Sequence, residues 1–241
     1  MLKVTLDLDL KKNQLEDYNM KNLKHYNLLS ELFRYPSENF LEKLLECQSL
    51  IDTNYPEAAL QLQIFTDYMS NCNADEREEI YTKSFDVQPI CYLDLGYVIF
   101  GEDYKRGAFL LHMQSEQKRI NNDCGFDLSD NICNVFTLMA KSDDEDFVNE
   151  LTVEIIIPAV KKMIAEFQSA RVDLKLKVLK KLHKAIIQEE LNQGNVYKNC
   201  FEAILIVLET DFDDVVVKSG NLNKIENQEH HDSFFNKSSV N

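Results

Sequence analysis

The chain has 241 residues, of which 44% are apolar, so it can bury the core of one large domain or of one domain with tails. Six glycines and four prolines are few for this length, and they favour an all-α fold over a turn-rich sheet fold. The 26 basic and 41 acidic side chains give a net charge of −15, which disfavours nucleic-acid binding and attracts cationic partners, unless the charge serves only solubility.

The first part of the chain changes from an irregular to a helical pattern. Residues 1–20 are expected to form a weakly ordered arm, because their alternating apolar residues have no evident partner strand. From Asn22 the apolar residues recur at helical spacing until Tyr35-Pro36, where the proline disfavours helix in the residue before it. A second helix follows, and Pro56 is well suited to the first turn of a third.

A fourth helix is predicted from its capping residues. Asn73 is a suitable N-cap, and Glu76 stands three residues later in the capping-box position. The acidic residues of this first turn also suit the positive end of the helix dipole. We expect the helix to end near Phe85-Asp86.

Helical periodicity continues through the rest of the chain, up to about residue 211. The polar residues 212–241 cannot bury enough surface to offset the entropy of ordering, so they are predicted to be a disordered tail. The fold prediction is therefore a single-domain, all-α helical bundle over residues 21–211. Its later helices are expected at 91–100, 103–125, from Asp130, around an interruption at Pro158, at 171–191 and at 196–209.

The sequence contains no local signature of an active site or of a cofactor. Nucleophile elbows, phosphate-binding glycine loops, dinucleotide fingerprints and zinc-binding spacings of cysteine and histidine are all missing, although a site assembled from distant residues stays possible. The six cysteines are scattered, which favours reduced thiols. No apolar run approaches the roughly 20 residues that span a bilayer, and residues 1–24 do not read as a signal peptide. We therefore expect a cytoplasmic protein without catalysis, cofactor, metal or membrane insertion.

Tyr81, Phe85 and Asp86 form the most conspicuous local group. Residues four apart lie on one face of a helix, and Asp86 stands where this helix is expected to end. In the core the two aromatic residues would anchor the following loop. On the surface they would make an aromatic platform beside a negative charge, suited to an apolar peptide with flanking arginine or lysine. Spacing alone favours the core.

Several motifs, taken in chain order, resemble those of the nitrate reductase delta-subunit family of molybdoenzyme assembly chaperones. The resemblance covers roughly residues 24–170 and is carried by Leu32-Phe33-Arg34-Tyr35-Pro36-Ser37, Tyr81-x-x-x-Phe85-Asp86, Leu93-x-Leu95-x-Tyr97, Gly101, Arg106-Gly107, Gly125-Phe126 and Leu128-x-Asp130. The chain departs from the family pattern at Gln88-Pro89-Ile90, at Ser129 and at Lys105, which leaves the identity of the client open.

The resemblance implies an all-α bundle that binds the apo form of the catalytic (alpha) subunit of a nitrate reductase-like molybdoenzyme, often through its basic N-terminal leader peptide. It implies that this subunit is held until the molybdenum cofactor is inserted. A groove with an apolar floor and acidic rims would suit such a leader. The client-binding residues carried over from the motifs are Tyr81, Phe85, Asp86, Tyr97, Arg106 and Gly107.

Each carried-over residue has an expected role. Asp86 would pair with arginines of the client. Arg106 would fix a loop or bind a carboxylate, and Gly107 would permit close approach of the client. The alternatives are a constitutive helical adapter, which would not leave its partner after cofactor insertion, and an enzyme, which the sequence supports least.

Overall fold

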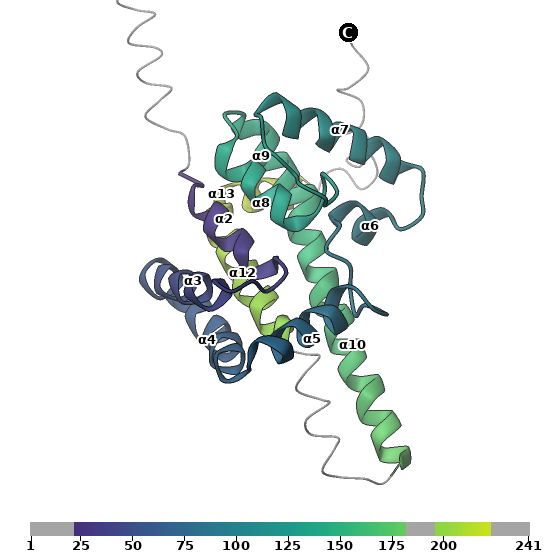
Figure 1. Ribbon diagram of the computed structural model, residues 1–241. Helices are drawn as coiled ribbons and strands as arrows, with labels where there is room; N and C mark the ends of the chain where they lie inside the picture. Colours follow the sequence, from purple (N-terminus) through teal and green to yellow (C-terminus); the bar gives the residue numbers. More distant parts are fainter. Residues whose placement is uncertain (1–21, 182–195, 223–241) are drawn as a thin grey trace, which may run out of the picture.

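The computed structural model describes residues 22–181 and 196–222, and these residues form a bundle of packed helices (Figure 1). Within these ranges there is no strand, only an isolated antiparallel bridge between Asp94 and Asn131. The predicted all-α bundle is thus confirmed. The arm predicted at residues 1–20 lies outside the described residues.

The N-terminal half supplies one side of the bundle. Its elements are α2 (His25–Leu29), the 3-10 turn η1 (Ser30–Phe33), α3 (Phe40–Asn54), α4 (Pro56–Asn71) and α5 (Ala74–Phe85). The capping box predicted at the start of α5 is present. The Glu76 N–H donates to Asn73 Oδ1 at 3.0 Å, and the Asn73 N–H donates to Glu76 Oε2 at 2.7 Å. Pro56 stands in the first turn of α4, as expected.

The C-terminal half supplies the helices that close the core. Its elements are α6 (Leu95–Phe100), α7 (Lys105–Arg119), α8 (Ile132–Lys141), α9 (Glu145–Leu151), the π-helix η2 (Thr152–Ile156), α10 (Ile157–Lys181), α12 (Val196–Asp211) and α13 (Asp213–Leu222). Within the described ranges, no helix is both long enough and apolar enough to cross a membrane.

Helix α12 is the centre of the core. It packs against α4 and α10, and it lies between them in Figure 1. Its aromatic residues join the two halves of the chain: Phe201 stacks on Phe33 at a centroid distance of 4.7 Å, and Tyr197 lies 5.0 Å from Phe65. The apolar run Ala203–Leu208, predicted to be central, is mostly buried here.

The interruption predicted at Pro158 takes the form of a π-helix. The N–H of Ile157 donates to the carbonyl of Thr152, five residues earlier. Proline has no N–H and crowds the preceding turn, and a single wide turn is a common way for a helix to absorb such an irregularity. The chain therefore passes from α9 into α10 without leaving a helical path.

Two helix boundaries differ clearly from the sequence prediction. Helix α6 begins at Leu95 rather than Cys91, because the residues before it pair with the loop around Asn131. Helix α7 ends at Arg119 rather than near Gly125, since Asn121 already takes a left-handed conformation with φ of 52°. Asparagine tolerates this conformation better than most residues do.

The predicted disordered tail is wrong in its first part. Residues 213–222 form α13, and Phe212 between the two last helices is fully buried. The end of α12 is also tied down, because Asp211 accepts hydrogen bonds from Tyr55 at 2.8 Å and contacts His25 Nε2 at 2.8 Å. Residues 223–241 lie outside the described part of the chain.

Candidate functional site

Tyr81 and Phe85 lie on the inner side of α5. Phe85 is only 9% exposed and packs edge-on against Tyr197 at 4.6 Å. Tyr81 is half-buried, and its hydroxyl donates to the carbonyl of Phe33 at 3.2 Å. The preference for the core that spacing gave is confirmed for Phe85. Its nomination as a client contact is corrected, because almost none of its surface is free to touch a partner.

Asp86 is exposed and follows directly after α5. Its N–H and that of Val87 both donate to the carbonyl of Thr82, and Gln88 then turns the chain with φ of 49°. The carboxylate is therefore held at the surface by a local turn, with its side chain free for a partner.

Tyr97 and Arg106 are brought together from α6 and α7. The guanidinium carbon of Arg106 lies 5.0 Å from the centre of the Tyr97 ring, which is a cation–π arrangement. Tyr92 packs edge-on against the Tyr97 ring, and the two ring centroids lie 4.4 Å apart. Nε of Arg106 is buried and makes no hydrogen bond within the described residues. Arg106 thus links α7 to α6 through the Tyr97 ring, and its role in fixing a loop or binding a carboxylate stays a prediction.

Gly107 is exposed, and a Cβ added there would have no neighbour within 4 Å. No contact inside the molecule therefore requires glycine at this position. The structure places Gly107 on the outer side of α7, one residue after Arg106 but away from the core.

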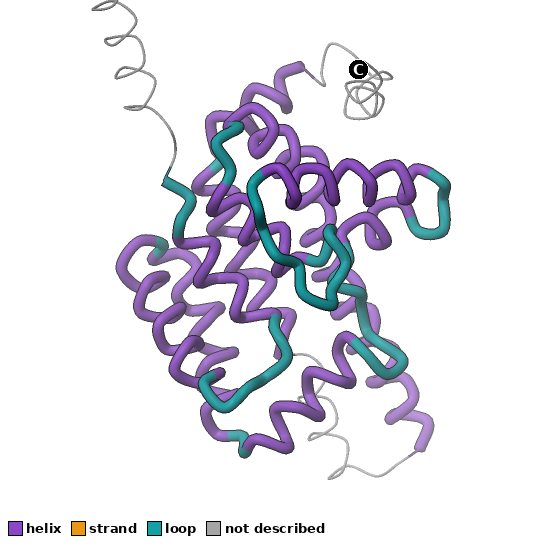
Figure 2. Tube along the Cα trace, turned by 45° about the horizontal axis from the view of Figure 1, so that its top comes forward, coloured by secondary structure: helices purple, strands orange, loops and turns teal. Residues whose placement is uncertain are grey.

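Two loops meet beside this cluster, and sequence reasoning missed the contact between them. The loop between α5 and α6 and the loop between α7 and α8 lie side by side (Figure 2), joined by the N–H of Leu95 donating to the Asp130 carbonyl and that of Ile132 donating to the Leu93 carbonyl. The Asp130 side chain is fully buried, and its Oδ2 accepts from the Gly96 N–H at 2.9 Å. In the sequence, Asp130 was interpreted as a helix start and stood in the Leu128-x-Asp130 motif, and neither signal paired it with Gly96.

Two carboxyls of this junction, that of the buried Asp130 and that of the half-buried Asp94, are shifted toward the protonated form. Burial, with the nearby Asp94 carboxyl second, raises the pKa of Asp130 to about 6. Burial also raises the pKa of Asp94, although Arg106 opposes this. Oδ1 of Asp130 accepts no hydrogen bond from the described residues, which suits a carboxyl that is protonated.

This shift predicts how stability depends on pH. The folded protein keeps the Asp130 proton up to about pH 6, whereas the unfolded chain releases it near pH 4, so the contribution of Asp130 to stability falls as the pH rises between these values. We expect Asp130→Asn to remove up to about 3 kcal/mol of this decline. Urea denaturation of both proteins at intervals from pH 4 to pH 7 measures the difference. If the free energies of unfolding of the two proteins changed with pH in parallel, the raised pKa of Asp130 would be contradicted.

Carboxylates gather on the outer side of the same loops. Asp86 and Asp127 both raise the pKa of Tyr81, after burial, and Asp127 raises that of Asp94. Asp86 also acts on Tyr35, whose pKa is raised chiefly by its hydrogen bond to Glu78. We call Asp86 and Asp127, with the exposed apolar side chains on these loops, the acidic surface. Its apolar members are Val87, Tyr92, Phe126 and Leu128.

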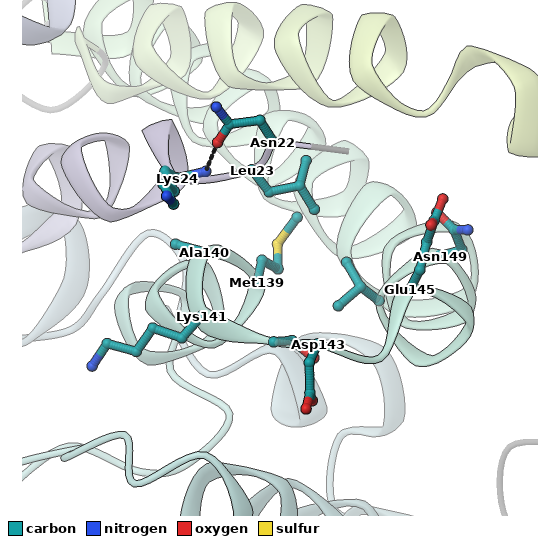
Figure 3. Close-up of a pocket in the computed structure, with 11 residues that line it drawn as sticks. Asn22, Leu23, Lys24, Met139, Ala140, Lys141, Asp143, Glu145 and Asn149 are labelled. Carbon is teal, nitrogen blue, oxygen red and sulfur yellow. Dashed lines mark hydrogen bonds between the residues drawn. The ribbon is translucent and has the colours of Figure 1, made fainter. Parts of the chain in front are cut away.

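A pocket of about 390 Å³ lies elsewhere, between the start of α2, the end of α8 and α9 (Figure 3). Leu23, Met139 and Val148 give it apolar walls, and Lys24 and Glu145 stand among its polar lining residues. None of the six residues nominated from the motifs lines it. The groove with acidic rims that was predicted for a leader peptide is not this pocket and stays a prediction.

The described residues offer little to a metal or to a nucleophilic reaction. No group of three or more histidine, cysteine, aspartate or glutamate side chains in residues 22–181 and 196–222 is arranged to hold a metal ion. All six cysteines are free thiols, and burial raises the pKa of each. A raised pKa keeps a thiol protonated and hence poorly nucleophilic.

The comparisons with known proteins add no relative. No protein-family model matches the chain, and no curated protein matches it either. The resemblance to the molybdoenzyme assembly chaperones therefore rests on the motifs quoted above.

Proposed function

We propose that the protein is a molecular chaperone that binds the apo catalytic subunit of a nitrate reductase-like molybdoenzyme in the cytoplasm and supports cofactor insertion. The observation that carries the proposal is the acidic surface, where the exposed carboxylates of Asp86 and Asp127 and four exposed apolar side chains lie on two adjoining loops. Of the motif residues, Asp86 lies on the loop after α5, Tyr97 of α6 packs against Tyr92 of that loop, and Arg106 of α7 contacts the Tyr97 ring. A basic leader peptide with an apolar helical face has the complementary chemistry.

Charge and apolar contact would contribute differently to this binding. Exposed ion pairs stabilise a complex by about 0–1 kcal/mol each, so apolar contacts at Val87, Tyr92 and Phe126 should supply most of the affinity. The net charge of −15 would mainly raise the rate at which a cationic leader meets the protein, and this effect falls with added salt. Phe85 would act indirectly, by holding the end of α5 in place.

Titration with a labelled synthetic peptide tests the charge complementarity. The probe is an arginine-containing amphipathic leader peptide, followed by fluorescence anisotropy at low salt. The double variant Asp86→Asn/Asp127→Asn should weaken binding about three- to tenfold, because two ion pairs are lost. The control Glu57→Gln/Asp67→Asn removes the same charge from exposed positions on α4 and should leave binding within about twofold. Equal losses in the two double variants would show a general charge effect and would contradict a local binding surface.

Capture from native cells tests the client itself. The tagged full chain should recover the large subunit of a molybdoenzyme, and it should recover more of it when molybdenum cofactor synthesis is blocked. Recovery without any such subunit would count against the chaperone. A complex that persists after cofactor insertion would favour a constitutive adapter instead.

A further inference from the structure

Tyr35 is an exposed aromatic side chain that contacts on both its ring and its hydroxyl hold in place. It lies in the link between η1 and α3, and it is 53% exposed, whereas the following Pro36 is buried. Its hydroxyl donates to Glu78 Oε2 at 2.8 Å, and its ring packs edge-on against Tyr81 at a centroid distance of 5.3 Å. The Tyr35 ring is therefore fixed against α5, and about half of its surface is open to a partner.

Two carboxylates act on this ring. Glu78 stands on α5 and Asp86 follows directly after that helix, and both are exposed. The hydrogen bond to Glu78 raises the pKa of Tyr35, and the charge of Asp86 adds to this effect. No cationic side chain of the described residues opposes the shift. The open side of Tyr35 is thus an aromatic surface in a negative field.

The cations that stand near this site in the sequence are paired with other carboxylates. Nε of Arg34 lies 3.0 Å from Glu31 Oε1. Nζ of Lys83 on α5 lies 2.6 Å from Glu79 Oε1. Because each of these pairs is neutral as a whole, the two carboxylates that act on Tyr35 keep their negative charge for a partner.

We propose that Tyr35, Glu78 and Asp86 form a binding site for the guanidinium group of an arginine on a partner peptide. We call these three residues the Tyr35 site. The guanidinium would stack on the open face of the ring and donate to the Glu78 oxygen that the Tyr35 hydroxyl does not use, and Asp86 would add attraction. The site adjoins the acidic surface through Asp86, so the inference rests on the proposed function for the identity of the partner, and it adds which cation that partner presents.

The ring makes an arginine a better ligand than a lysine. A guanidinium is planar and weakly hydrated, so it can lie flat on an aromatic ring while its edge still donates hydrogen bonds. An ammonium group is a compact and strongly hydrated charge, which loses more hydration when it meets a ring. The molecule already contains the arrangement, since the guanidinium carbon of Arg106 lies 5.0 Å from the centre of the Tyr97 ring. A carboxylate without a ring, such as Asp127, would attract both cations about equally.

Two leader peptides that differ only in lysine for each arginine test this selectivity. Both are titrated with the full chain at low salt, followed by fluorescence anisotropy. The arginine peptide should bind about two- to fivefold more tightly than the lysine peptide. Tyr35→Leu should bring this ratio to about one, because the carboxylates stay and the ring is lost. Tyr35→Phe, which keeps the ring, should keep most of the ratio.

Tyr104→Leu is the matched control, because Tyr104 is 82% exposed and follows two acidic residues in the chain. This variant should keep the ratio of the original protein, and thermal melts of all three variants show whether they fold. A ratio near one in the original protein would overturn the proposal. A ratio that survives in a folded Tyr35→Leu protein would overturn it as well.

A titration without any peptide separates this inference from the proposed function. Ethylguanidinium added to about 100 mM should shift the ring resonances of Tyr35 in NMR spectra of tyrosine-labelled protein, and ethylammonium should shift them less than half as far. Tyr35→Phe identifies these resonances by removing them. If the shift is seen and neither leader peptide binds, the Tyr35 site stands and the binding surface proposed for the chaperone fails. If a molybdoenzyme subunit is captured and ethylguanidinium causes no shift, the function stands and the Tyr35 site is overturned.

Discussion

Replacing Phe85 by alanine should lower the free energy of unfolding by about 3–5 kcal/mol, which is the usual cost of removing a buried phenylalanine. The side chain is 9% exposed and touches the rings of Tyr197 and Phe201, so its removal leaves a cavity between α5 and α12. Urea denaturation followed by circular dichroism measures the change. Asp86→Asn, one residue later, is the contrasting variant and should stay within about 0.5 kcal/mol of the original protein.

This pair of variants separates the two interpretations of the Tyr81-x-x-x-Phe85-Asp86 motif. If Phe85 were a client contact, Phe85→Ala would lose peptide binding while keeping nearly full stability. If Asp86 were a structural residue, its replacement would unfold the protein rather than weaken binding. Either result would contradict the division of roles that burial assigns, with the aromatic residue in the core and the carboxylate at the surface.

Gly96→Ala should be the most damaging single-methyl change in the described part of the chain. A Cβ at this position would lie 2.7 Å from Asp130 Oδ2 and 2.8 Å from Phe109 Cδ1, both of which are buried. The carboxyl oxygen that would clash is also the acceptor of the Gly96 N–H. We expect a loss of about 2–3 kcal/mol, typical of overpacking, because the alanine must push α6 away from α7 or break that hydrogen bond.

Gly107→Ala is the control for this prediction. The same methyl group meets open space at position 107, and alanine favours helix over glycine by about 0.5–1 kcal/mol, so the variant should be as stable as the original or slightly more stable. Thermal melts of the two variants side by side give the comparison. If the Gly96→Ala protein had the same melting temperature as the original, the two loops would not be held together by Asp130.

The sequence predicted those parts of the fold that local chemistry determines. The Asn73 capping box, Pro56 in a first turn and the interruption at Pro158 each depend on residues within one turn of helix. The burial of Phe85 followed from its spacing to Tyr81. These signals are readable because neighbours in sequence are also neighbours in space.

The junction of the two loops was not predictable in the same way. Asp130 and Gly96 are neighbours only because the chain folds back on itself, and nothing near either residue indicates the other. Asp130 looks like a helix cap, whereas Asn131 takes that position, and its Oδ1 accepts a hydrogen bond from the Cys133 N–H. The tail prediction failed for a related reason. Val215 and Val216 pack on the core, but the prediction used the average polarity of residues 212–241, in which these two apolar side chains carry little weight.

The central place of α12 also bears on biosynthesis. Phe33, Phe65 and Phe85 each pack against Tyr197 or Phe201, which leave the ribosome long after them. At about 5–20 residues per second, the nascent N-terminal helices would wait on the order of ten seconds with these rings uncovered. Chains cut short before α12 should therefore aggregate rather than accumulate as a smaller folded protein.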